Sequence, residues 1–346
     1  MAASPIFIVG ANRSGTTLLR LVLNAHPRIA IPEELIYFRS TMADVPVENW
    51  ADPSLPDDTY AAFVRQFIDQ NCEPLSGLDR DTLINEVLKG PHDFREPYRR
   101  VLEAWAAAHG KERWGEKTPG NLFFVDILLE MFPDAKFIHL VRDPRACVSS
   151  MNRASFFSSD TVLNALNWRK YVTQGDTLLE GIPSSQYTTL RYEDLVDTPE
   201  SCVRALCKFL EEDFDPGMLR FHRDAERYMK AEAANSFNSA ATRPISDSMI
   251  SKWKAQLNRA EIALIEWICA DAMTEHGYTP IGPPLRIRDW PFLLVKQGYW
   301  LLQTARHSHV REYTVHHEFL ARVRGHLRTF AQPHTKSPTM PTSNGK

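Results

Sequence analysis

Short apolar runs that end at polar loops recur along the first 200 residues of the chain. The first run, Ile6–Val9, leads through a loop rich in Gly, Asn and Ser into a helical pattern over residues 18–23. Two further runs, residues 136–141 and 186–191, also end at polar loops that lead into helical patterns. Strands that alternate with helices in this way form a parallel sheet covered on both faces, with ligands at the carboxyl ends of the strands. The pattern therefore predicts an α/β fold.

Helical periodicity dominates residues 60–110, with interruptions at Gly77, Gly90 and Pro97. This stretch is expected to form helical insertions over the sheet rather than strands. The stretch 277–284, which is rich in Pro and Gly, is typical of the end of a domain.

The C-terminal part differs chemically from the α/β domain expected over residues 1–282. Residues 286–346 carry 10 Lys and Arg against 3 Asp and Glu, although the whole chain has a net charge of −3. Apolar residues at helical spacing predict a basic helical appendage over 283–332, and composition predicts a disordered tail over 333–346. The sequence leaves four roles for the appendage open: peripheral contact with an anionic membrane, bringing an acceptor near the site, packing on its own domain, and contact with a second subunit as a homodimer.

The remaining composition narrows the class of protein. Five cysteines without paired short spacing predict neither a disulfide framework nor a Cys-based zinc site. Because no basic leader precedes Ile6 and no run of about 18 apolar residues follows, we expect no signal peptide and no membrane span. A cytoplasmic location is therefore expected, and no metal or nucleic-acid site is indicated.

The loop Gly10–Thr17 lies between a predicted strand and a predicted helix. Backbone N–H groups and the helix dipole can hold an anionic group at such a place. A nucleoside triphosphate loop would read G-x-x-x-x-G-K-[ST], but here Thr16 stands at the Lys position and Arg13 supplies the cation. The loop therefore predicts an anion site without the lysine and magnesium chemistry of such enzymes, unless it is only a helix entry.

This loop resembles the 5′-phosphosulfate-binding motif of sulfotransferases that use 3′-phosphoadenosine 5′-phosphosulfate (PAPS). Residues 18–27 and Pro32–Glu34 are similar to the tyrosylprotein branch and its bacterial relatives. The resemblance implies a P-loop-type three-layer αβα sandwich and PAPS as co-substrate, with no metal required. The 5′-phosphosulfate ligands that it implies are Arg13, Ser14, Gly15, Thr16 and Thr17.

A second segment, Leu140–Met151, resembles the 3′-phosphate-binding segment of the same family. The resemblance implies that Arg142 and Ser150 contact the 3′-phosphate, and a guanidinium is well suited to phosphate. A surface pair of Arg142 with Asp143 is the structural alternative.

Two further segments carry weaker similarity. Tyr192, in the block 191–195, matches a tyrosine near the nucleotide, although a core aromatic explains it almost as well. Residues 246–253 resemble the segment that closes over PAPS, which implies Ser248 and Lys252 as further phosphate ligands.

Sulfuryl transfer needs a base for the acceptor and cations for the leaving phosphate. The resemblance implies Glu34 as the catalytic carboxylate, with Lys117 and Arg13 as the cations. Glu33 competes with Glu34 for the role of base, and a surface ion pair with Glu116 is the alternative for Lys117. His139, inside a predicted strand, is interpreted as structural; a solvated acidic turn remains the alternative for the two glutamates.

The predicted function is transfer of a sulfuryl group from PAPS to a hydroxyl or amine of an unidentified acceptor. A P-loop small-molecule kinase or a non-catalytic nucleotide-binding module remains the alternative. The acceptor can be a carbohydrate, a lipid, a small metabolite or a protein tyrosine, because acceptor choice depends on the variable insertions near 36–110 and 154–180.

Overall fold

The computed structural model describes residues 4–38, 57–93, 95–155, 157–229 and 241–282. The predicted appendage and tail therefore lie outside the described residues, and the domain division stays a prediction.

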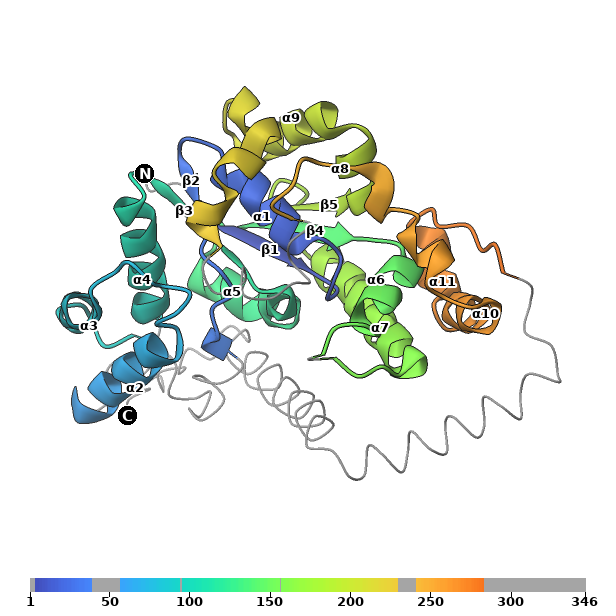
Figure 1. The fold of residues 1–346 in the computed structure, drawn as a ribbon. Helices are drawn as coiled ribbons and strands as arrows, with labels where there is room; N and C mark the ends of the chain where they lie inside the picture. Colours follow the sequence, from blue (N-terminus) through green and yellow to red (C-terminus); the bar gives the residue numbers. More distant parts are fainter. Residues whose placement is uncertain (1–3, 39–56, 94, 156, 230–240, 283–346) are drawn as a thin grey trace, which may run out of the picture.

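A five-stranded sheet with the order β2-β3-β1-β4-β5 forms the centre of the fold (Figure 1). All four pairings are parallel. The strands are β1 Ile6–Gly10, β2 Ile29–Ala30, β3 Arg113–Lys117, β4 Lys136–Val141 and β5 Tyr187–Arg191. The predicted parallel α/β sheet is thus confirmed, and three of its strands lie where the apolar runs placed them.

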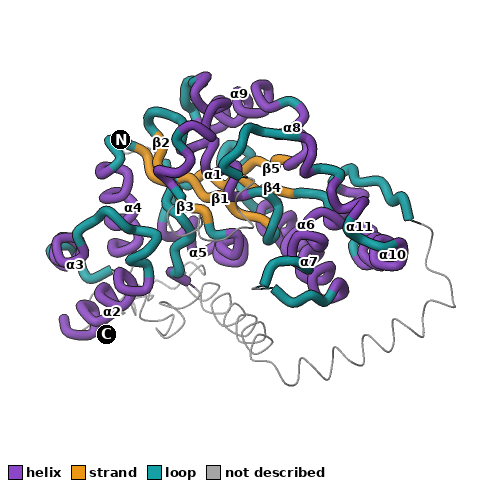
Figure 2. Tube along the Cα trace, viewed as in Figure 1, coloured by secondary structure: helices purple, strands orange, loops and turns teal. Residues whose placement is uncertain are grey.

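Helices cover both faces of this sheet, as the colours of Figure 2 show. On one face lie α1 (Thr16–Asn24), α8 (Tyr192–Asp197) and α9 (Pro199–Leu210), and on the other lie α5 (Val125–Met131), α6 (Pro144–Met151) and α7 (Thr161–Glu180). The other helical elements are α2 Asp57–Gln70, α3 Arg80–Leu88, α4 Arg95–Ala108, η4 Pro119–Phe124, η5 Pro216–Arg223, η6 Ala225–Tyr228, η9 Asp247–Met249, η10 Lys252–Ala255, α10 Arg259–Ile268 and α11 Ala270–Glu275.

Successive side chains of β1 point to opposite faces of the sheet, and so they pack in two different layers of the core. Phe7 packs in the cluster that contains the side chains of α4 and α5, whereas Ile8 packs with those of α1 and α9. Both residues are fully buried. Because both faces are covered, β1 and most of β4 are apolar, which made these two strands recognisable in the sequence.

The stretch before β3 is helical, as predicted, but one boundary was wrong. Pro97 lies within the first turn of α4 and does not interrupt a helix. Proline is tolerated there because the first N–H groups of a helix have no partner inside it. The strand β3 was not predicted, although all five of its residues are buried.

The parallel arrangement brings four strand ends to the same edge of the sheet. The chain leaves β1 at Gly10, β3 at Lys117, β4 at Val141 and β5 at Arg191. Every segment predicted to bind the phosphates or to carry the cations begins at this edge or next to it.

Candidate active site

The loop after β1 turns tightly against two neighbouring strands. Gly10 has φ 150°, and a Cβ there would lie 2.3 Å from the carbonyl oxygen of Leu140 on β4. Gly15 caps α1 at φ 103°, and its Cβ would lie 2.4 Å from the ring of Tyr192. Between them Arg13 has φ 66°, a left-handed conformation that is uncommon for a residue with a side chain. The backbone is thus folded close to the ends of β4 and β5, as an anion-binding loop requires.

Four of the predicted donor-binding residues lie together. Arg13 Nε donates to Ser150 Oγ over 3.1 Å, and Arg142 Nη1 donates to the Arg13 carbonyl oxygen over 3.2 Å. The Arg142 guanidinium lies 4.1 Å from the centre of the Tyr192 ring. Residues 13 and 150 are 137 positions apart in the chain, yet the sheet topology joins the two predicted phosphate segments.

Two buried polar atoms at this place have no hydrogen-bond partner among the described residues. They are Ser14 Oγ and Arg142 Nε. Leaving a buried donor without an acceptor costs about 1–3 kcal/mol. Phosphate and sulfate oxygens accept from both groups, so the residues fit an anionic donor.

Thr16 and Thr17 form the first turn of α1 behind the loop. Thr16 is buried, and Thr17 Oγ1 lies 3.5 Å from Lys117 Nζ. The hydroxyl of Thr17 therefore connects the predicted phosphate loop with the predicted catalytic lysine.

Lys117 and Glu34 form the second part of the site. Lys117 Nζ lies 2.6 Å from Glu34 Oε1. The Lys117 side chain is fully buried, whereas 49% of the Glu34 side chain is exposed. Glu33 is only 4% exposed. Of the two adjacent glutamates, Glu34 is thus the one that both contacts the lysine and can reach an acceptor.

Glu116 is a site residue that the sequence did not reveal as such. It is fully buried, and burial raises its pKa to about 7, with the charge of Glu34 adding to the rise and hydrogen bonds from Thr118 opposing it. Lys117 is buried and pairs with Glu34, so the surface ion pair considered for Lys117 and Glu116 is wrong. The only signal in the sequence was a Glu next to the lysine in a strand with few apolar residues.

The segment 246–253 contacts the site through its main chain. Arg142 Nη2 donates to the carbonyl oxygen of Met249 over 2.8 Å. Ser248 Oγ lies 2.9 Å from Ser246 Oγ, and Lys252 is exposed at the start of η10. The structure thus places this segment next to Arg142, while phosphate contacts by Ser248 and Lys252 stay predictions.

His139 lies in the interior of β4, on the side of α7. Its Nδ1 is 3.7 Å from Asp176 Oδ1, and burial lowers its pKa to about 4. A Cβ on Gly175 of α7 would lie 2.8 Å from the imidazole. A neutral, enclosed ring agrees with the structural role inferred for it.

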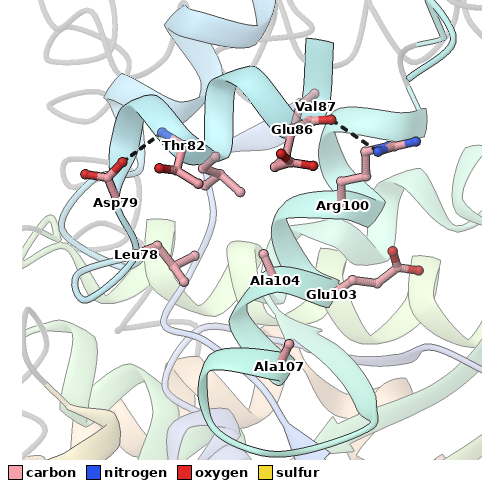
Figure 3. A pocket seen from close by; sticks show the side chains of 10 residues that line it. Leu78, Asp79, Thr82, Glu86, Val87, Arg100, Glu103, Ala104 and Ala107 are labelled. Atoms are coloured by element: carbon pink, nitrogen blue, oxygen red, sulfur yellow. Dashed lines mark hydrogen bonds between the residues drawn. The ribbon is translucent and has the colours of Figure 1, made fainter. Parts of the chain in front are cut away.

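A pocket of about 380 Å³ lies between α3 and α4, as Figure 3 shows. It is lined by Leu78, Asp79, Thr82, Leu83, Glu86, Val87, Arg100, Glu103, Ala104 and Ala107. None of the predicted site residues lines it, so it is separate from the phosphate loop. Within the described ranges, no three His, Cys, Asp or Glu side chains form a group that could hold a metal. The part of the chain that the structure describes also contains no helix suited in length and apolarity to span a bilayer.

The chain is similar in sequence to known sulfotransferases. A family model described as "Sulfotransferase family" matches residues 5–216. The chain is 25% identical over 303 residues to protein-tyrosine sulfotransferase 1 of Danio rerio, which covers 84% of this chain and 76% of the relative. It is 24% identical over 292 residues to protein-tyrosine sulfotransferase A of Caenorhabditis elegans, with 81% and 68% covered.

Two solved structures share the fold. The sulfotransferase domain of the Synechococcus PCC 7002 olefin synthase superposes with a TM-score of 0.57 at 24% identity, covering 80% of this chain and 96% of the domain. The sulfotransferase domain of the curacin biosynthetic pathway gives 0.60 at 21% identity, with 81% and 99% covered. These matches confirm the predicted P-loop-type α/β fold.

Proposed function

The chain belongs to the sulfotransferase family and is a PAPS-dependent sulfotransferase, and we propose that Glu34, Lys117 and Arg13 carry out the transfer. The observation that supports this assignment best is the position of Lys117 Nζ, 2.6 Å from Glu34 and 3.5 Å from Thr17 of the phosphate loop. One buried ammonium group thus lies between the proposed base and the loop proposed for the donor.

In this proposal, Arg13 and Arg142 bind different phosphate groups of the donor. The loop residues Arg13 to Thr17 bind the 5′-phosphosulfate, and Arg142 with Ser150 binds the 3′-phosphate. The hydrogen bond from Arg13 to Ser150 supports this division, because it joins the two segments to which the phosphates are assigned. Tyr192, Ser248 and Lys252 complete the donor site.

The transfer breaks the bond between sulfur and the bridging oxygen of the 5′-phosphate, and forms a bond between sulfur and the acceptor oxygen. Glu34 takes the proton of the acceptor hydroxyl. The leaving group is adenosine 3′,5′-bisphosphate, and Lys117 and Arg13 stabilise the negative charge that develops on its phosphate.

The contact between Lys117 and Glu34 has a consequence for the order of events. The donor phosphate and Glu34 compete for the same ammonium group. Donor binding therefore supplies the buried Lys117 with a second anionic partner, and the half-exposed Glu34 becomes available for the acceptor.

For the acceptor we propose a hydroxyl compound. The relatives named above are protein-tyrosine sulfotransferases, which makes a tyrosine in a protein a reasonable first candidate. Carbohydrates, lipids and small metabolites remain the alternatives, since acceptor choice depends on the insertions around the site.

A screen of acceptors with ³⁵S-labelled PAPS tests this function. Tyrosine peptides, sugars, hydroxylated lipids and phenols are each incubated with the protein, and labelled product is separated from PAPS. Transfer to one class supports the proposal and identifies the acceptor. ATP with magnesium serves as the control: phosphorylation of the same compounds, without sulfation, would instead indicate a kinase.

For residues 283–346 we keep the proposal of a basic appendage followed by a tail. The excess of Lys and Arg in this stretch supports contact with an anionic membrane from the cytoplasmic side, or with a second subunit. Co-sedimentation with vesicles, with and without anionic lipid, tests the first. The second is tested by the molecular mass of the full chain and of a truncation at Pro284.

A further inference from the structure

The last two residues of β3 contact two consecutive residues of the segment that carries the proposed base. Neighbouring side chains of a strand point to opposite faces of the sheet. Lys117 contacts the side chain of Glu34, and Glu116 accepts a hydrogen bond from the backbone N–H of Leu35. The segment 34–35 is therefore held from both sides of the strand end.

Glu116 accepts hydrogen bonds from several donors at once. Its Oε1 accepts from Leu35 N over 3.4 Å and from the hydroxyl of Thr118. Its Oε2 accepts from Thr118 N over 3.1 Å and from Asn121 Nδ2 over 2.5 Å. An ionised carboxylate can only accept hydrogen bonds and thus satisfies all four donors.

Thr118 lies against the backbone carbonyl group of Leu35. Its Oγ1 lies 3.2 Å from the carbonyl oxygen of Leu35, so the single hydroxyl hydrogen is shared between this oxygen and Glu116. The next amide in the chain, Ile36 N, donates to Asn71 Oδ1 over 2.7 Å. The backbone just after Glu34 is thus fixed at three successive points.

We propose that Glu116 is a positioning residue, which holds the main chain of Leu35 so that the carboxylate of Glu34 stays next to Lys117. The inference rests on the proposed role of Glu34 as the base. Glu116 does not touch the donor or the acceptor in this account; it acts through the segment that carries Glu34.

A carboxylate is required at this position because of its hydrogen-bonding pattern. In Glu116→Gln an amide NH2 replaces one oxygen and faces either the N–H of Leu35 or the donors of Thr118 and Asn121. Two donors facing each other repel, so one of the two contacts is lost while the volume is kept. Burial raises the pKa of Glu116, so the ionised form of this carboxyl is costly at its position.

Hydrogen exchange of the segment 31–38 provides a direct test. In the intact full-length protein, Glu116→Gln should speed exchange of the Leu35 amide about tenfold, while β1 and β4 keep their protection. Thr118→Val should loosen the same segment, and Thr118→Ser, which keeps the hydroxyl, should not. Glu266→Gln is the matched control, because Glu266 is also a buried carboxylate that accepts from two backbone amides, at Ile281 and Gly282.

The second readout is the release of sulfate from PAPS, in which water takes the place of the acceptor. Positioning predicts that Glu116→Gln lowers kcat about tenfold and leaves the KM for PAPS within about twofold. Unchanged exchange of 31–38 and unchanged kcat would overturn the inference. Glu34→Gln separates it from the proposed function: if that variant keeps full turnover, the base assignment fails, whereas loss in Glu34→Gln without loss in Glu116→Gln removes only the role of Glu116.

Discussion

Lys117 and Glu34 meet at 2.6 Å, but the two side chains have very different surroundings. The lysine is fully buried at the end of β3, and about half of the glutamate side chain is exposed. The lysine is held in place by packing, while the glutamate can move toward a bound acceptor. This asymmetry suits a fixed cation for the leaving group and a base that turns between two partners.

Glu34→Gln removes the proposed base with almost no change in shape. Turnover should fall about 100-fold or more, which is the usual contribution of a positioned base, while binding of adenosine 3′,5′-bisphosphate is kept. Steady-state kinetics and titration calorimetry measure the two quantities. Glu33→Gln is the control and should have a milder effect, because Glu33 is buried. If only the Glu33 variant is inactive, the two roles are reversed.

Lys117→Met keeps most of the volume of a buried side chain and removes its charge. The leaving phosphate then loses its main cation, and kcat should fall by about two to three orders of magnitude. Rapid-quench measurement of a single turnover isolates this step from product release. Lys170→Met, on α7, is the control for removal of a partly buried lysine. An unchanged single-turnover rate in the Lys117 variant would place the cation elsewhere.

Arg13→Ala and Arg142→Ala each remove a charged contact to phosphate. Each should weaken the binding of adenosine 3′,5′-bisphosphate by about 2 kcal/mol, or about 30-fold. Titration calorimetry gives both values, with Arg169→Ala as the control because Arg169 is exposed on α7. Wild-type affinity in either variant would exclude that arginine from the donor site.

The pKa of Glu116 predicts how stability changes with pH. Its value of about 7 in the folded protein lies above the ordinary 4.5, so the folded state holds the proton more tightly than the unfolded chain. This stabilisation is complete below about pH 4.5 and is lost as the pH rises through 7. Relative to the wild type, Glu116→Gln should therefore gain up to about 3 kcal/mol in free energy of unfolding between pH 5 and pH 8.

Urea unfolding of the two proteins at pH 5, 6, 7 and 8 measures that difference. A constant difference at all four values would show that Glu116 does not titrate in this range. The result also bears on the positioning role, since loosening of residues 31–38 in a variant that is not globally destabilised cannot result from general unfolding.

The strands that could be predicted from sequence are β1, β4 and β5, each of which leads into a polar loop and then a helical pattern. The run 136–141 gave β4 its bounds, and Ile6–Val9 gave β1 all but its last residue. β3 was not predicted because it contains Arg113, Glu116 and Lys117, which are polar residues in a buried strand. The guanidinium of Arg113 donates to the carbonyl oxygens of Ser4 and Leu210, partners that only the folded chain brings near.

Residues of the site could likewise be predicted only where they lie in a contiguous motif. The loop around Arg13 and the segment of Arg142 were recognisable because each is a contiguous motif at the end of a strand. The roles of Lys117 and Glu34 were implied only by a resemblance, and their contact was not predicted, since 83 residues separate the two. The hydrogen bond between Glu116 and Leu35 could not be predicted from the sequence, because it depends on which backbone groups meet at the edge of the sheet.

The fate of the label in the complex with ³⁵S-labelled PAPS tests the central claim most directly. Wild type and Glu34→Gln are each loaded with the labelled donor and then mixed with the acceptor found in the screen, and bound and transferred label are separated after rapid quenching. The account predicts that both proteins bind the same amount of PAPS and that only the wild type transfers the label promptly. Transfer by the variant at the wild-type rate, or a wild type that does not bind PAPS, would contradict it.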